Sequence, residues 1–392
     1  MLDVTWHINS QQDLLIGSKI LSGLSALRRK GHLSLRFIPN VRCPKMRDEL
    51  VLWTVRDKDD SGPARRLVID LLDTSEFICP VGLNYADVYF KRDLMLGPLE
   101  LLPVHLRKRV RPFGLNNICY DARSWPDWLA ASAVRARMTA ATDLRSAVNG
   151  FIEAVRLFTV IPGRNAFIAR PEEQKRPFVL FQTRVWPPQR SGLDLEPLNR
   201  ERVRLAMTLG SALGERFVGG IVGDEFARTQ YPEAVVRKSV RQLEYAALTR
   251  SALVGVYSRG VHGSLAYKLS EYMAAGCCMV VEPWEHILDV PLESGVHYLP
   301  YHSAESCVAA CETLLADKTL AAEMSRRNSD YYLRYLLPER QVERILAAAV
   351  AAECKAYPSE GYASPQDSTS RAIDLRPTLC HEANSQSARR SS

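Results

Sequence analysis

The period of the apolar positions changes twice between Ala252 and Val281, and the rest of the chain is organised around this stretch. Ala252–Tyr257 is a short apolar run rich in valine, and Cys277–Val281 is a second, continuous one. Both are typical of strands that are covered on both faces of a parallel sheet. Between them lies a helical period, whose apolar face is formed by Leu265, Leu269, Tyr272 and Met273. The pattern predicts a strand–helix–strand unit.

Residues that favour helix ends flank the predicted helix. Ser264 is expected to be its N-cap, and Gly276 is expected to follow its last turn. The polar loop 258–263 would then lie at the carboxyl edge of the sheet, where open α/β folds bind ligands. The backbone N–H groups of Gly263 and Ser264 would face an anion there, at the positive end of the helix dipole.

Two charged side chains lie on one face of the same helix. Lys268 and Glu271 are three residues apart, roughly opposite Leu269 and Met273. We expect Glu271 about two turns into the helix, where its carboxylate would accept hydrogen bonds from sugar hydroxyls. An anion site beside such a carboxylate indicates a nucleotide ligand. The alternative is a solvent-facing ion pair, which contributes only a few tenths of a kcal/mol.

Strands and helices also alternate over most of the remaining chain. The segments Leu2–Ile8, Leu15–Arg29 and Leu33–Ile38 are predicted as strand, helix and strand, the first unit of a doubly wound domain. A polar, proline-bounded linker is expected at 162–177, a second sheet begins with Phe178–Gln182, and Asn199 is expected to cap the following helix. The expected organisation is an α/β domain at 1–165, a second at 178–337, a helix at 338–356 and a disordered tail at 357–392.

Two segments of the first half carry charged side chains of interest. Asp73 follows the strand predicted at Arg66–Leu72, and an acidic residue in that position can face a cleft and act as a base. A turn former or helix N-cap is the alternative role for Asp73. Leu101–Arg111 places four cations among leucines and valines, which fits either a patch resting on an anionic membrane surface or a solvated segment.

Composition narrows the class of protein. With 392 residues, 46% of them apolar, the chain is long enough for two domains with full cores. Nine cysteines, an odd number without a CxxC pair, favour reduced thiols in a cytoplasmic protein, which would touch a membrane only peripherally. There is no apolar run of transmembrane length and no signal-peptide pattern at the N-terminus. The net charge of +7 selects no partner, and no zinc-finger spacing, RNP motif or long basic run indicates nucleic-acid binding.

Five segments, in this order, resemble glycosyltransferases of the GT-B fold, in particular the bacterial group 1 and spore-coat-type enzymes. They are LFQTRVW, ERFVGGI, KLSEYMAAGCCMVVEP, ESGVHYLPY and the helix pair SAESCVAACETLLADKTLAAEMSRRNSDYY. The third segment resembles the family's Glu-x-Met-Ala-x-Gly helix, turn and strand. The resemblance extends from about Phe178 to Leu346 and is weak before Arg170. It implies an α/β protein with two Rossmann-like domains that face each other across a cleft, with the nucleotide-sugar donor mainly on the second.

The resemblance also implies roles for single residues. Glu271 matches the glutamate that holds the ribose hydroxyls, and Lys268 and Arg184 match positions where a cation faces the phosphates. The donor-binding candidates as a set, including the polar residues of the loop, are Arg184, Arg259, His262, Gly263, Ser264, Lys268 and Glu271. Gly263 stands where retaining members carry a second glutamate, so the resemblance leaves the stereochemistry open. No metal-binding acidic triplet is evident, and the fold implies a reaction without metal or cofactor.

The expected function is transfer of a sugar, in the manner of a hexosyltransferase, from a nucleotide-sugar donor to an acceptor that is a glycan, a lipid-linked molecule or a small molecule. Asp73 is the candidate base for the catalytic step. Two alternatives remain open at this point. One is an enzyme of the same fold with nucleotide-sugar epimerase-like chemistry, and the other is a non-catalytic protein that binds a glycan or a partner. A dehydrogenase is disfavoured because no GxGxxG follows the first strand.

Overall fold

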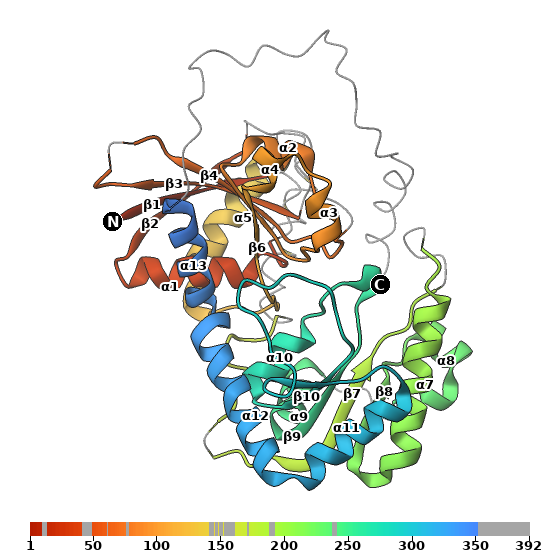
Figure 1. Cartoon of the computed structure of the whole chain (residues 1–392). Coiled ribbons are helices and arrows are strands. Elements are labelled where there is room, and N and C mark those ends of the chain that lie inside the picture. Colours follow the sequence, from red (N-terminus) through yellow and green to blue (C-terminus); the bar gives the residue numbers. More distant parts are fainter. Residues whose placement is uncertain are drawn as a thin grey trace.

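Two separate β-sheets, each covered by helices, make up the protein in the computed structural model (Figure 1). The structure describes residues 1–9, 14–40, 49–60, 62–75, 78–140, 145, 148, 152, 161–170, 172–187, 193–236 and 241–351. The α/β fold with two sheets that the sequence predicts is confirmed. The tail expected at 357–392 and part of the linker lie outside the described residues.

The first sheet has the strand order β2-β1-β3-β4-β5-β6. Its strands are β1 (Leu2–Ile8), β2 (Leu33–Pro39), β3 (Leu50–Asp57), β4 (Arg65–Asp70), β5 (Val88–Lys91) and β6 (Val110–Pro112). The helices around it are α1 (Ser18–Arg29), α2 (Pro80–Tyr85), α3 (Leu96–Glu100), α4 (Val104–Arg107), the 3-10 turn η1 (Ala122–Ser124) and α5 (Trp125–Ala140). This sheet is not the wholly parallel one of a doubly wound domain, because β3 runs antiparallel to both β1 and β4. The connection from β3 to β4 is too short for a crossover, so the two strands form a hairpin.

The second sheet is wholly parallel and has the order β11-β10-β9-β7-β8. Its strands are β7 (Arg176–Thr183), β8 (Phe217–Ile221), β9 (Ala252–Tyr257), β10 (Cys278–Val281) and β11 (Tyr298–Pro300). The helical elements are α7 (Glu196–Leu213), η3 (Gly214–Arg216), α8 (Glu225–Gln230), η4 (Pro232–Ala234), α9 (Gln242–Ser251), η5 (Val261–Gly263), α10 (Lys268–Ala275), α11 (Ala304–Ala316) and α12 (Lys318–Tyr331). This order reverses the winding between the neighbouring strands β7 and β9, and open α/β sheets bind ligands beside such a switch point.

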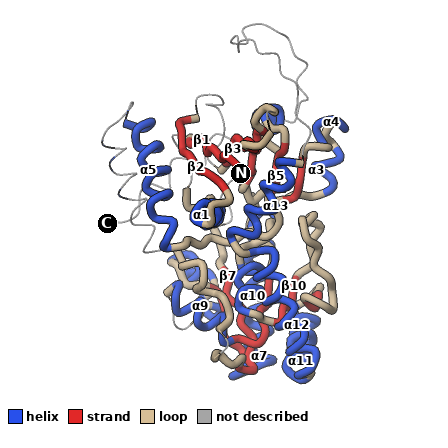
Figure 2. The backbone as a smooth tube through the Cα atoms, turned by 90° about the vertical axis from the view of Figure 1, so that its left-hand side faces the viewer, coloured by secondary structure: helices blue, strands red, loops and turns tan. Residues whose placement is uncertain are grey.

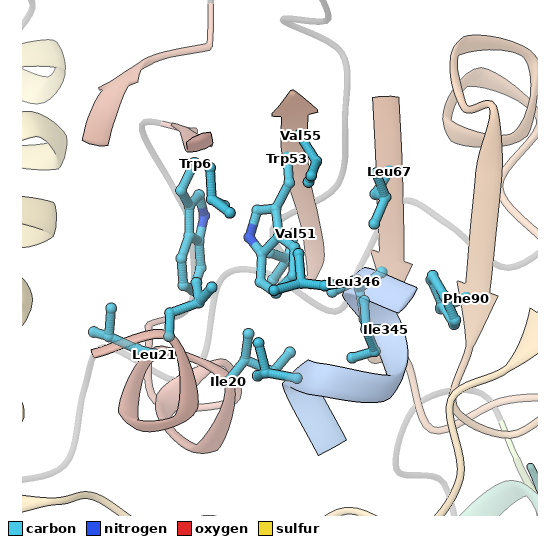
Figure 3. Close-up of a cluster of buried hydrophobic side chains, with 14 of the residues drawn as sticks. Trp6, Ile20, Leu21, Val51, Trp53, Val55, Leu67, Phe90, Ile345 and Leu346 are labelled. Carbon is cyan, nitrogen blue, oxygen red and sulfur yellow. The ribbon is translucent and has the colours of Figure 1, made fainter. Parts of the chain in front are cut away.

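The last described helix returns to the first domain. After the π-helical turn η6 (Tyr332–Leu336), α13 (Pro338–Val350) packs along α1, as the blue and red helices of Figure 1 show. Ile345 and Leu346 insert into the same apolar cluster as Trp6 and Trp53 of the first sheet (Figure 3). A Cβ atom at Gly23 of α1 would lie 2.3 Å from the backbone oxygen of Pro338, so only glycine allows this close helix pairing.

Two of the predicted helix caps are wrong. Ser264 does not cap a helix, because α10 begins only at Lys268, and the Ser264 hydroxyl donates to the backbone oxygen of Val261 instead. Asn199 lies inside α7, and its side-chain amide bonds both the N–H and the C=O of Trp186. Gly276 is confirmed as the left-handed residue that ends α10, with φ of 64°.

In the part of the chain that the structure describes, no helix is long and apolar enough to cross a membrane. The side view in Figure 2 shows the short helices α3 and α4 on one side of the first domain, and α11 and α12 at the opposite end of the molecule. Cys307 and Cys311 of α11 are both fully buried against the second sheet.

Candidate functional site

The central unit of the second domain depends on a close contact between β9 and α10. Gly255 of β9 lies directly beneath the ring of Tyr272, and a Cβ atom there would lie 2.8 Å from that ring. The Tyr272 hydroxyl also donates to the backbone oxygen of Val256. These two contacts hold α10 against the strand, so the first turn of α10 has a defined position at the carboxyl edge of the sheet.

The loop between β9 and α10 makes a tight left-handed bend. His262 has φ of 62° and Gly263 has φ of 71°, within the short turn η5. A non-glycine residue in this region is uncommon, which marks His262 as conformationally constrained. Both residues are exposed. The bend therefore lies at the surface, and Gly263 is not at a helix start as the sequence predicts.

Lys268 and Glu271 both lie in the first turn of α10 and are half-buried. Glu271 is thus nearer the start of the helix than the two turns that the sequence suggests. The Lys268 ammonium group donates to the Tyr245 hydroxyl at 2.6 Å. Burial lowers the pKa of Lys268 to about 8, although the nearby carboxylate of Glu271 opposes this. Burial also raises the pKa of Glu271, and the Lys268 charge opposes that shift.

Two arginines add positive charge beside this pair. Burial is the main cause that lowers the pKa of Lys268, and the charges of Arg184 and Arg202 are weaker causes in the same direction. Arg184 is exposed at the carboxyl end of β7, and its backbone oxygen accepts a 2.7 Å hydrogen bond from Arg202. Clustered cations around a single carboxylate favour binding of an anionic group.

Arg202 is a residue that the sequence interpretation missed. Its side chain is buried, it donates to the backbone oxygens of Arg184 and Arg259, and burial lowers its pKa to about 10. The signal was present in the periodicity of α7. Arg202 occupies a position of the apolar stripe that also contains Leu198, Leu205 and Leu209. A cation at such a position must be satisfied by specific partners.

Arg259, another donor-binding candidate, is engaged elsewhere. Its guanidinium group forms ion pairs with Glu282 and Glu201, and its N–H donates to Glu282 at 2.9 Å. It lines a pocket of about 440 Å³ at the carboxyl ends of β9, β10 and β11, on the side of α7. Among the described residues, Arg202 also lines this pocket, whereas Lys268 and Glu271 do not. The predicted donor-binding residues therefore lie in two neighbouring places. Arg259 lines this pocket, whereas Lys268 and Glu271 lie in the first turn of α10.

Asp73, the candidate base, lies in the first domain. It is exposed in the loop that follows β4, and its charge is one of the causes that raise the pKa of the buried Arg92. It therefore lies near Arg92, which in turn contacts the loop before α10. Within the described ranges, no group of three or more histidine, cysteine or acidic side chains is arranged to hold a metal ion.

With this geometry in place, the relation to known proteins becomes informative. Residues 197–347 match the family model described as glycosyl transferase-like. This part of the chain is glycosyl transferase-like. The resemblance inferred from the sequence is confirmed here, and the matched segment contains Arg202, Arg259, Lys268 and Glu271. No curated protein matches the chain.

The solved structures that match this chain share little sequence identity with it. A glycosyltransferase from Rickettsia africae shares 10% identity at a TM-score of 0.40, with 87% of this chain and 82% of that one covered. The UDP-GlcNAc 2-epimerase of Neisseria meningitidis, solved with UDP-GlcNAc, shares 10% identity at a TM-score of 0.35 and coverages of 71% and 68%. TarM from S. aureus shares 14% identity at a TM-score of 0.32, and the match covers 46% of this chain but only 36% of TarM. Likenesses at these scores decide nothing about function.

Proposed function

We propose that this protein transfers a hexosyl group from a nucleotide-sugar donor to an acceptor, without a metal or other cofactor. The observation that carries the proposal is the position of Lys268 and Glu271 in the first turn of α10, at the carboxyl edge of a parallel sheet and within the glycosyl transferase-like segment. The carboxyl edge of such a sheet is where open α/β folds bind nucleotides.

Each group at the proposed site has a role that its chemistry supports. The Glu271 carboxylate accepts hydrogen bonds from the ribose hydroxyls. Lys268 and Arg184 face the diphosphate, and the N–H of Gly263 donates to one of its oxygens. Transfer requires stabilisation of the diphosphate as the bond to the sugar breaks, and fixed positive groups do this without reorganisation. Buried Arg202 holds the backbone at Arg184 and Arg259, and it thereby fixes the two ends of the site.

A thermal-shift screen of the full chain with UDP, GDP, ADP, CMP and dTDP, each with its sugars, tests the sugar-donor site. A ligand at a hundred times its dissociation constant adds about 2.7 kcal/mol of stability, which such a screen detects. One nucleotide should stabilise the wild type, and the shift should be lost in Glu271→Ala. Glu312→Ala on the exposed face of α11 is the matched control and should keep the shift. Equal shifts in both variants would refute the assignment of Glu271.

Asp73 is the proposed base that accepts the proton of the acceptor hydroxyl. Its place at the carboxyl end of β4, exposed and near Arg92, supports this role. Asp73→Asn should lose transfer by a factor of roughly 10² to 10⁴, as expected for a general base, with unchanged affinity for the sugar donor. Transfer at the wild-type rate would remove Asp73 from the mechanism.

A non-catalytic binding protein is the second candidate, and one observation favours it. Gly263 stands where retaining relatives of the resembled family carry an acid, so the sugar has no carboxylate beside it at this point. Slow hydrolysis of the nucleotide sugar by the wild-type protein, in the absence of acceptor, distinguishes the two. Binding without either hydrolysis or transfer to any acceptor would favour the second candidate.

A further inference from the structure

A short segment of the first domain crosses to the second domain directly after β5. Arg92–Met95 follows the carboxyl end of that strand and runs beside the loop after β10. The N–H of Ile287 donates to the backbone oxygen of Leu94 at 2.7 Å, and Met95 pairs with His286 in an isolated antiparallel bridge. The two domains are therefore joined here by backbone contacts that resemble a piece of sheet.

The side chains of Arg92 and Asp93, the first two residues of this segment, bond the backbone of Leu265 in the loop before α10. The N–H of Leu265 donates to the Asp93 carboxylate at 2.8 Å. The backbone oxygen of Leu265 accepts from the Arg92 guanidinium group at 2.9 Å. Consecutive residues of one domain thus satisfy both backbone polar groups of a single residue in the other, and we call this arrangement the Leu265 clamp.

The clamp is deeply buried and its charges are matched. Asp93 is fully buried and Arg92 is 6% exposed, and the two side chains approach each other at 3.5 Å. The Arg92 guanidinium group also lies over the ring of Tyr267, 4.6 Å from its centre. His286 lies 3.6 Å from Asp93, and burial lowers the pKa of this histidine, although the Asp93 charge opposes this. Arg92 is the permanently charged partner of Asp93.

The rest of the loop is held from within its own domain. The Tyr257 hydroxyl donates to the backbone oxygen of Ser264 and accepts from the N–H of Ala266, both at 3.1 Å. The N–H of Gly260 bonds the same Ser264 oxygen at 2.8 Å. Among the described backbone hydrogen bonds of this loop, those of Leu265 are made to side chains of the first domain. Without Arg92 and Asp93, both polar groups of this buried residue would lose their partners.

We propose that Arg92 and Asp93 are positioning residues that give the loop 258–267 its sugar-donor-binding shape, so that this site is complete only when the first domain is docked. The clamp acts on Leu265, which is one residue after Ser264, two after Gly263 and three before Lys268, so loss of the clamp changes the geometry at the phosphate end of the site. This inference rests on the proposed function for its consequence, although the clamp itself can be tested without any ligand.

The first experiment measures amide hydrogen exchange in the peptide spanning 258–268 of the unliganded full chain. Asp93→Ala should increase exchange of this peptide at least about tenfold, because a buried N–H loses its acceptor. Asp93→Asn keeps an oxygen that accepts from Leu265 and should restore protection. Ser270→Ala is the matched control, because it removes a buried bond to the backbone oxygen of Asn116 in the first half of the chain without touching the loop. Equal exchange in Asp93→Ala and Ser270→Ala would overturn the clamp.

The second experiment measures the affinities of the same variants for UDP, GDP and ADP by calorimetry. Asp93→Ala should bind the nucleotide preferred by the wild type roughly tenfold more weakly than Ser270→Ala does, even where the two variants melt at the same temperature. Equal affinities would overturn the positioning role. If Asp93→Ala does not fold, Arg92→Met removes the bond to the Leu265 oxygen, together with a bond to the backbone oxygen of Leu71, and must show the same pattern. A wild type that binds no nucleotide would contradict the proposed function, while the exchange data would still decide on the clamp.

Discussion

The surroundings of the Lys268 side chain determine how strongly its ammonium group holds its proton. Its ammonium group is half-buried, it donates to Tyr245, and its pKa is lowered to about 8 by burial and by the nearby arginines. In the unliganded protein this shift makes stability rise with pH between about 8 and 10.5, because the unfolded chain binds the additional proton there. A bound diphosphate has the opposite effect, since it favours the protonated amine.

Affinity for a nucleoside diphosphate should therefore fall as pH rises above about 8. Roughly fivefold is expected between about pH 8 and pH 9 if the charge of Lys268 is essential, since half of the amine is protonated at its pKa and about a tenth one unit above it. Calorimetric titration at several pH values measures this, and Lys268→Gln should bind weakly with a flat profile. A wild-type profile that is flat over the same range would show that Lys268 does not face the phosphates.

For single residues, the sequence indicates which side chains are candidates for the site, but it does not indicate their hydrogen-bond partners. The position of Lys268 and Glu271 on one helix follows from spacing alone, whereas the contact of the Lys268 ammonium group with the Tyr245 hydroxyl does not. The assignment of Ser264 as a cap was wrong because the N–H of the next residue, Leu265, has its acceptor on Asp93, 172 residues away. Local capping rules do not include such a partner. Arg202 was missed because only tertiary contacts reveal which backbone oxygens a buried guanidinium group satisfies.

Among the elements, α10 and β9 determine the site together. The ring of Tyr272 occupies the space above Gly255, and this contact sets the height of α10 over the sheet. The sequence predicted both elements correctly, because their apolar periods are local and strong. It did not predict that β3 would run antiparallel, since strand direction depends on the length of a connection and on pairing partners rather than on period.

Gly255→Ala should displace α10 and destabilise the protein by about 1–3 kcal/mol, the usual effect of overpacking a filled core. Urea unfolding measures the loss, and nucleotide affinity should fall in parallel because Lys268 and Glu271 move with the helix. Gly97→Ala in α3 is the control, because a Cβ atom there meets nothing within 4 Å. Stability equal to that of the control would mean that the helix adapts without cost.

For the molecule as a whole, an apolar–basic patch on one side of the first domain is a second place of interest. It comprises the exposed side chains of Leu96, Leu101 and Val104 together with Lys108 and Arg111. Leu101 is 78% exposed, which is unusual for a leucine beside basic residues. The net charge of +7 also favours binding of the chain to anionic surfaces. We propose that this patch rests on a membrane when the acceptor is lipid-linked.

The full chain should therefore bind vesicles that contain phosphatidylserine, and about 0.5 M salt should weaken this binding by screening the basic residues. The double variant Leu101→Ser with Val104→Ser should reduce co-sedimentation, whereas Leu333→Ser, which removes an exposed leucine of η6, should not. If binding to vesicles does not change with salt, with lipid charge or in the double variant, this patch has no role in membrane binding.

The return of α13 to the first domain makes the second domain an insertion between two parts of the first. During synthesis, Ile345 and Leu346 leave the ribosome after every strand of both sheets, yet they belong to the core around Trp6 and Trp53. The first domain to emerge is thus the last to be completed, in contrast to chains whose domains finish one after the other. A nascent chain that stops before Pro338 would carry the whole second sheet and an open face on the first. Quality control acting on that face would link the supply of the finished protein to translation of its last helix.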